Sequence, residues 1–162
     1  MDASGCKDVP RGRVKPIVQL QNGGKEPFFT MSYNDRGNYL YCDWHGYLVH
    51  QQIVDGANQM LEWARANAAS RDCFAVVNDN RRLRGSWEVA VEWIDRNWNK
   101  PMFEAGVRYN AIVIGQDLFT QVSAEALAAT NRPGSIATRL LPSLQAAEAW
   151  IAELREGPAA GR

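Results

Sequence analysis

The chain has 162 residues, of which 46% are hydrophobic and 22% charged, a composition typical of one globular domain with a core of its own. Its 18 basic and 18 acidic residues give a formal net charge of zero, which argues against a nucleic-acid-binding protein, because such proteins need a basic excess. No apolar run reaches the roughly 20 residues of a membrane-spanning helix, and residues 1–8 lack the apolar stretch of a secretory signal.

Cysteine and histidine content argues against a disulfide framework and against a zinc site. The three cysteines, Cys6, Cys42 and Cys73, are an odd number at wide spacing. The two histidines, His45 and His50, form no metal-binding pattern with them. We therefore expect a cytoplasmic protein with reduced thiols, no metal and no cofactor.

The two ends of the chain differ from its middle. Residues 1–15 are polar and mildly basic, and we expect them to form a flexible N-terminal arm. Residues 157–162 are rich in Gly and Ala, and we expect a disordered tail there. One folded domain should therefore span residues 16–156.

Strands are predicted first along the chain. A short strand is expected at 17–21, and the side chains of 28–34 and of 39–44 alternate between two faces with the two-residue period of a strand. The Asp-Arg-Gly-Asn sequence at 35–38 is typical of a turn. The second and third strands should therefore pair as an antiparallel hairpin.

The pattern then changes to that of an amphipathic helix. Residues 51–68 place apolar side chains three or four positions apart, as in a helix that packs on a sheet. Residues 73–77 are continuously apolar, which is typical of a strand buried on both faces. The polar residues that follow predict that this strand ends there and that 78–87 is a loop. The remaining predicted elements are a helix at 87–99 capped by Ser86, a strand at 108–114, a short helix at 124–130 capped by Ser123, an edge strand at 137–141 and a helix at 143–155.

Strands and helices alternate from Tyr39 onward. Parallel strands joined by right-handed crossovers are the expected result of this order. The sequence therefore predicts an α/β fold, a single domain whose mixed, mostly parallel sheet begins with an antiparallel hairpin. The strands expected to be mutually parallel are those near 39–44, 73–78, 109–114 and 137–141.

Two sequence strings carry a family resemblance. They are YLYCDWHGYL at 39–48 and VVNDNRRLRGSW at 76–87. With the order of elements over residues 17–155, they resemble the STAS family, the fold of bacterial anti-sigma-factor antagonists, and are closer still to small bacterial STAS-like proteins of unassigned activity. The resemblance implies a STAS-like βα superhelix and a regulatory, non-enzymatic role.

The predicted loop 78–87 is the leading candidate for a binding site. Three arginines beside a helix start suit a small anion or an acidic protein partner. In anti-sigma-factor antagonists an Asp directly after the strand is followed by the Ser or Thr that is phosphorylated. Here Asp79 is followed by Asn80, and Ser86 is only the nearest serine. This difference argues against a phosphorylation switch at Ser86. The alternative is a solvated loop in which Asp79 pairs with an arginine. The candidate site residues are Asp79, Asn80, Arg81, Arg82, Arg84 and Ser86.

Two other functions remain open. A small-molecule or lipid-binding domain would have its pocket near Trp44, His45 and Tyr109. An enzyme would use His45, whose imidazole titrates near neutral pH. No nucleophile motif accompanies this histidine, so a structural role in a turn is the favoured interpretation.

The six tryptophans are many for this length. Trp87 and Trp98 fall on the predicted core stripe of their helix, whereas Trp93 falls opposite, with Val89 beside it. An outward tryptophan is a good interface anchor, so we expect Trp93 and Val89 at a homodimer contact, unless the chain's own segments cover them. The leading function is a non-enzymatic module that binds a protein partner or a small anion.

Overall fold

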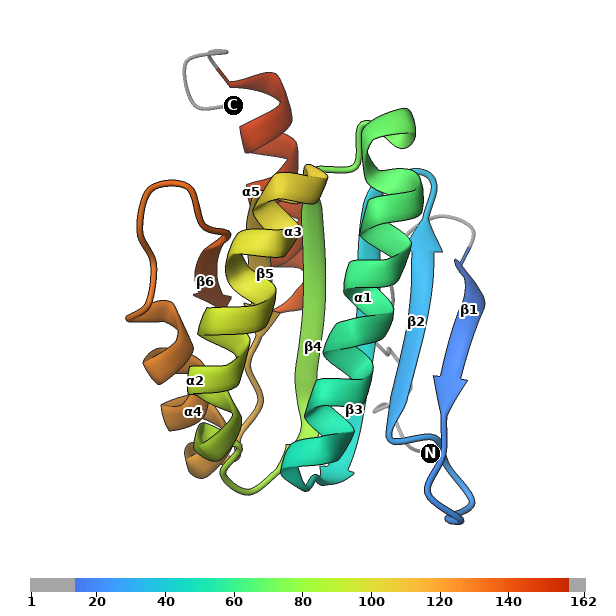
Figure 1. Cartoon of the computed structure of the whole chain (residues 1–162), viewed down its shortest axis with the longest axis vertical. Helices are drawn as coiled ribbons and strands as arrows, with labels where there is room; N and C mark the ends of the chain where they lie inside the picture. Colours follow the sequence, from blue (N-terminus) through green and yellow to red (C-terminus); the bar gives the residue numbers. More distant parts are fainter. Residues whose placement is uncertain (1–13, 158–162) are drawn as a thin grey trace, which may run out of the picture.

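The fold is built on a six-stranded sheet whose strands lie in sequence order, β1 to β6 (Figure 1). The computed structural model describes residues 14–157. The expected arm and tail therefore fall almost entirely outside the described residues. The strands are β1 Val14–Leu20, β2 Phe29–Asn34, β3 Tyr39–Tyr47, β4 Ala75–Arg84, β5 Tyr109–Val113 and β6 Ala137–Leu141.

The sheet is mixed, as predicted. β1, β2 and β3 pair antiparallel, and β2 and β3 form the expected hairpin, with Phe29 opposite Trp44 and Asn34 opposite Tyr39. β3, β4, β5 and β6 are mutually parallel. The predicted α/β class and strand directions are therefore confirmed.

Helices cover both faces of the sheet, but unequally. Each parallel strand is added on the same side of the one before, so successive right-handed crossovers lie on one face. Accordingly α1, the helical segment η2 to α3, and α4 cover one face, and α5 alone packs on the other (Figure 1). The helical elements are α1 His50–Arg71, η2 Glu88–Ala90, α2 Val91–Ile94, the π-helical η3 Asp95–Asn99, α3 Lys100–Ala105, α4 Leu118–Ala128 and α5 Leu144–Glu156.

Strand alternation divides the buried side chains into two cores. On β3, Leu40 and Cys42 face the larger core under α1, α2 and α4, whereas Tyr39 faces the smaller core under α5. Val76 and Ile112, at 0% and 2% exposure, lie in the larger core. This burial agrees with the strands predicted at 73–77 and 108–114.

The predicted loop at 78–87 is wrong, because β4 continues to Arg84. Its second half pairs with β3 as far as Tyr47, after a register shift between Asp43 and His45. Its polar side chains are buried at Asn78, Asp79 and Asn80. Burial of polar groups in a strand requires partners on neighbouring strands, and local sequence does not reveal those partners.

Two helix boundaries also differ from the sequence prediction. The fourth helix begins at Leu118 rather than at Ala124, and its N-cap is Asp117, which accepts a hydrogen bond from the Thr120 amide. Ser123 lies inside this helix and is buried. The helix predicted at 87–99 continues to Ala105, and a π-helical turn precedes Pro101, whose ring would clash with a regular helical turn.

Truncation of the buried Ile112 tests the core. Ile112→Ala should lower the free energy of unfolding by about 2–5 kcal/mol, because it removes buried methylene groups and leaves a cavity. Val89→Ala, at a residue that is 72% exposed, should change it by no more than about 0.5 kcal/mol. Urea unfolding followed by circular dichroism gives both values, and equal midpoints would contradict the assignment of the core face of β5.

Candidate functional site

The predicted site residues of β4 point to opposite faces of the sheet. Asp79 and Arg81 lie on the face that α5 partly covers, beside Tyr41 of β3. Asn78 and Asn80 lie on the other face, under α1 and α2. The six residues expected to form one site are therefore divided between two environments, because neighbouring residues of a strand alternate in direction.

Asp79 is the centre of a buried ionic cluster. Its carboxylate side chain is 4% exposed and accepts from Arg81 Nε at 2.9 Å and from Arg81 Nη2 at 2.6 Å. The Tyr41 hydroxyl donates to the same carboxylate at 2.5 Å. Burial, together with this negative charge, raises the pKa of Tyr41 well above its ordinary value. The phenol therefore stays protonated and serves as a donor.

Arg82 is also neutralised within the chain. Its Nη2 lies 2.6 Å from Asp43 Oδ2, and its Nη1 lies 3.1 Å from Glu26 Oε2. Nδ1 of His45 lies 3.4 Å from the same Glu26 oxygen. Burial raises the pKa of Asp43, and the hydrogen bond from Arg82 opposes that rise. His45 therefore belongs to a surface charge cluster.

Arg84 is the arginine of the three that pairs with no carboxylate among the described residues. Its Nη1 donates to the carbonyl oxygens of Arg81 and Leu83, each at 3.1 Å. With Arg81 it borders an open groove of about 730 Å³ that Gly115 also lines. One free guanidinium beside a wide groove is a weaker anion site than the three arginines predicted from sequence.

The turn between β4 and η2 is fixed to α4. The Gly85 amide donates to Asp117 Oδ2 at 3.2 Å, and its carbonyl accepts from Thr120 Oγ1 at 2.8 Å. The Trp87 amide donates to Ser123 Oγ at 3.0 Å. Ser86 Oγ accepts from the Glu88 amide at 3.3 Å, but the helical segment begins at Glu88 with Trp87 at its N-cap position, so the prediction that Ser86 is the N-cap is wrong.

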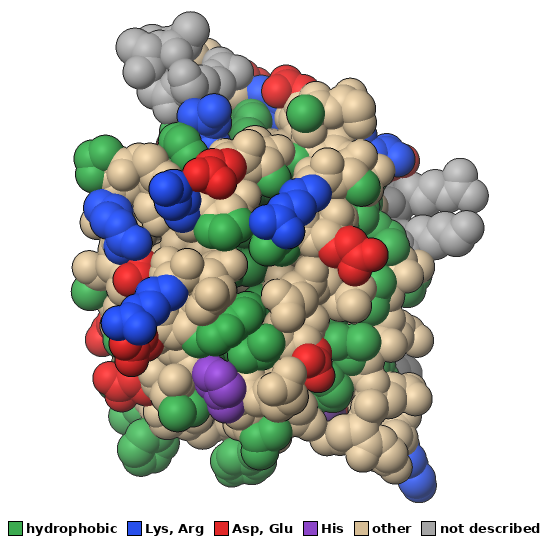
Figure 2. Space-filling view, viewed as in Figure 1, with side chains coloured by type: hydrophobic (Ala, Val, Ile, Leu, Met, Phe, Trp, Pro, Cys, Tyr) green, Lys and Arg blue, Asp and Glu red, His purple; other side chains and the backbone are tan. Residues whose placement is uncertain are grey.

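An exposed apolar surface surrounds this turn at the carboxyl edge of the parallel strands. Its members come from the end of β3, from the N-cap residue of α1, from η2 and from the first turns of α4, and hydrophobic side chains gather along the lower margin of Figure 2. Tyr47 lies directly beside Gly85, where an added Cβ would be 3.0 Å from the phenol ring. We call this surface the edge patch; its residues and exposures are Tyr47 79%, Val49 64%, Val89 72%, Leu118 72%, Phe119 68% and Val122 50%.

Sequence reasoning named only Val89 of the edge patch. Leu118 and Phe119 open α4 after the four-residue loop that follows β5, and apolar residues at a helix start normally signal burial, so their exposure could not be predicted. Trp93, the other predicted interface residue, is partly buried and packs against the larger core. A homodimer contact through Trp93 stays a prediction.

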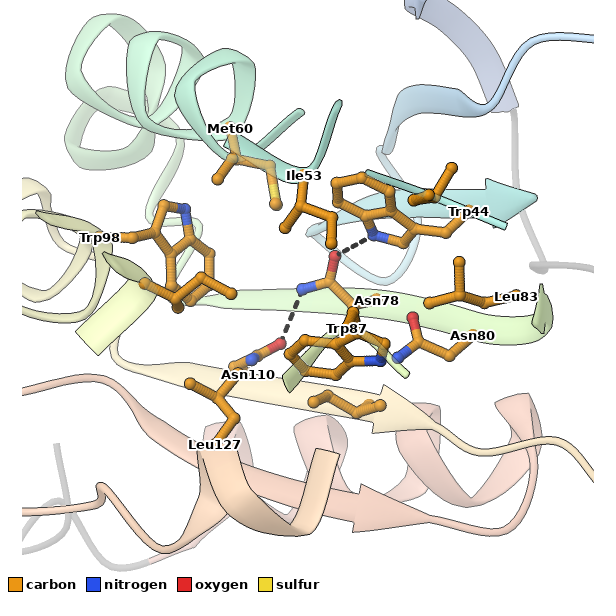
Figure 3. Close-up of a pocket in the computed structure, with 14 residues that line it drawn as sticks. Trp44, Ile53, Met60, Asn78, Asn80, Leu83, Trp87, Trp98, Asn110 and Leu127 are labelled. Atoms are coloured by element: carbon orange, nitrogen blue, oxygen red, sulfur yellow. Dashed lines mark hydrogen bonds between the residues drawn. The ribbon is translucent and has the colours of Figure 1, made fainter. Parts of the chain in front are cut away.

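A cavity of about 50 Å³ lies between the sheet, α1 and α2 (Figure 3). Trp44 Nε1 donates to Asn78 Oδ1 at 2.9 Å across it, and Asn78 Nδ2 donates to Asn110 Oδ1 at 2.8 Å. Of the three residues predicted to form a ligand pocket, only Trp44 lines the cavity. Tyr109 lies on the other face, against Phe74 and Trp150. Other lining residues include Ile53, Met60, Asn80, Leu83, Trp87, Trp98 and Leu127.

Comparison with known proteins identifies no relative. The chain matches no protein-family model, no curated protein and no solved structure. No helix among residues 14–157 is both long and apolar enough to cross a membrane. Over the same residues, no group of three or more His, Cys, Asp or Glu side chains could hold a metal ion. The functional conclusion therefore depends on the geometry of the chain itself.

The two arginines Arg81 and Arg84 should behave differently on substitution. Arg81→Ala leaves the buried Asp79 carboxylate without its countercharge and should destabilise the fold by about 1–3 kcal/mol. Arg84→Ala removes an exposed side chain with no carboxylate partner among the described residues, and should change stability by less than about 0.5 kcal/mol. Thermal unfolding of the two variants measures the difference, and a neutral Arg81→Ala would show that the ion pair contributes nothing.

The thiols of Cys42 and Cys73 should be unreactive in the folded protein. Burial raises the pKa of Cys73 to about 11 and that of Cys42 well above its ordinary value, so both are protonated at pH 8. Iodoacetamide, which attacks the thiolate, should leave both unmodified for hours in native Cys6→Ser protein and alkylate both in urea. Mass spectrometry measures the modification, and rapid native labelling of either residue would contradict the assigned burial.

Proposed function

We propose that this domain is a non-catalytic binding module that docks a protein partner on the edge patch. The observation that carries the proposal is the gathering of six large apolar side chains, each at least half exposed, around one turn. Contiguous exposed apolar surface costs solubility, and on soluble domains it commonly marks a protein-binding site. The resemblance to STAS-like proteins, which implies a regulatory role, agrees with this proposal.

The edge patch is supported by a rigid base. The hydrogen bonds from Gly85 and Trp87 to α4 hold three chain segments together, and the left-handed backbone of Gly85, with φ of 79°, forms the tight turn between them. A surface that is already ordered loses little conformational entropy on binding. The patch therefore has the preorganisation that a docking site requires.

Exposed carboxylates on η2 and α4 favour a partner with basic flanks, although Arg84, opposite Tyr47 on β4, adds one positive charge beside the patch. Glu88 precedes Val89 and is exposed, and Glu125 lies one helical turn after Val122 and is also exposed. α4 carries no Lys or Arg over its length, Leu118–Ala128. Complementary charge increases the association rate and the specificity of binding more than the affinity. Because salt screens these charges, added salt should lower the association rate.

A small anion is a less well supported ligand. Arg81 and Arg82 are paired with carboxylates of the same chain, and an incoming anion would have to displace Asp79, Asp43 or Glu26. Arg84 alone would remain to hold it. We therefore place the binding site on the edge patch and not on the arginine cluster.

Site-specific photo-crosslinking tests the proposal. A benzophenone amino acid replaces Phe119, at the centre of the patch, or Ile17, a 46% exposed apolar residue on β1 at the far edge of the sheet, as the control. In cells that naturally produce this protein, irradiation should give a discrete crosslinked product from position 119 and none from position 17. The double substitution Val89→Ser and Val122→Ser should abolish that product without lowering the melting temperature.

The outcomes separate the alternatives. Equal products from both positions, or no product from position 119, would contradict docking on the edge patch. A product of twice the mass of this chain would identify the partner as a second copy, which is the homodimer expected from the sequence.

A further inference from the structure

The cavity under α1 and α2 has the composition of a site for an uncharged ligand. Its walls include three tryptophans and several aliphatic side chains, and no charged residue lines it. An ionised group that entered this space would lose its hydration without meeting a countercharge, which is strongly unfavourable. A neutral molecule would meet apolar walls and a few amide groups.

Two of the tryptophans that line the cavity, Trp87 and Trp98, have a buried indole N–H with no acceptor within the described part of the chain. Asn80 also lines the cavity and is 4% exposed, so its amide can donate to a molecule held there. In the view of Figure 3 the amide nitrogen of Asn80, rather than its oxygen, lies on the side of the Trp87 indole nitrogen.

This arrangement leaves the Trp87 N–H without an acceptor, because an indole N–H and an amide NH₂ are both donors. Buried donors without acceptors are uncommon in folded proteins, and each one is explained by strain, by water or by a ligand.

We propose that the cavity is a binding site for a small uncharged molecule of about four non-hydrogen atoms that carries a carbonyl or hydroxyl oxygen. The size follows from the volume of about 50 Å³, because roughly 10–15 Å³ is needed for each water-sized group. The oxygen accepts from Trp87 and Asn80. The rest of the molecule contacts the apolar wall formed by Trp44, Ile53 and Met60. This site is independent of docking on the edge patch.

Nuclear magnetic resonance of the ¹⁵N-labelled full chain tests the proposal, because each of the six tryptophans gives one indole N–H signal. The probes are acetamide and acetate, which have the same number of non-hydrogen atoms but differ in charge. Acetamide should shift the Trp87 signal saturably at concentrations on the order of 1–10 mM, as expected for so small a ligand. Acetate should leave it unchanged. A Trp87→Phe variant assigns the signal.

Two cavity variants and one matched control identify the site. Asn80→Leu should weaken acetamide binding at least tenfold, because the amide that donates to the ligand is gone. Ala57→Val, which adds two methyl groups to a lining residue, should also weaken it. Asn58→Leu makes the same exchange as Asn80→Leu on the exposed side of α1 and should bind like the wild type.

Three results would overturn the proposal. They are no saturable shift with acetamide, an equal shift with acetate, and wild-type binding by both cavity variants. The first of these would mean that the cavity holds water alone. If Asn80→Leu fails to fold, the comparison of Ala57→Val with Asn58→Leu decides.

Discussion

The four parallel strands are joined by a line of buried side-chain hydrogen bonds that crosses the sheet beneath the helices. It runs from Trp44 on β3 through Asn78 on β4 and Asn110 on β5 to Thr138 on β6, with each strand contributing one residue. Asn78, Asn110 and Thr138 are at most 7% exposed. A slip of one residue in any of these strands would turn its polar group to the opposite face and leave its neighbour unpaired, so the line fixes strand register.

The positions of both candidate sites follow from this register. With Asn78 held on the helix-covered face, alternation places Asn80 beside the cavity and sends Asp79 and Arg81 to the opposite face. The charged groups of β4 are thereby satisfied within the chain, through Tyr41 on the neighbouring strand. The surface that remains for a partner is apolar, and it lies where β4 turns toward α4.

The cavity and the edge patch come within two residues of each other. Trp87 lines the cavity and directly precedes the helical segment, while Val89 is part of the edge patch. The backbone between them is anchored to α4 through Ser123. A ligand that ordered Trp87 would therefore act on the same rigid base that supports the patch, although each site can be tested without the other.

The sequence by itself determined the strand directions, the α/β class and the buried faces, because these follow from local periodicities of two and 3.6 residues. Only the tertiary structure decided that β4 continues through Asp79, since the partner that stabilises this polar segment, Tyr41, lies 38 residues away in sequence. The exposure of Leu118 and Phe119 was decided in the same way. Local sequence predicts that apolar residues are buried, but whether distant segments cover them depends on tertiary packing, which the local pattern does not contain.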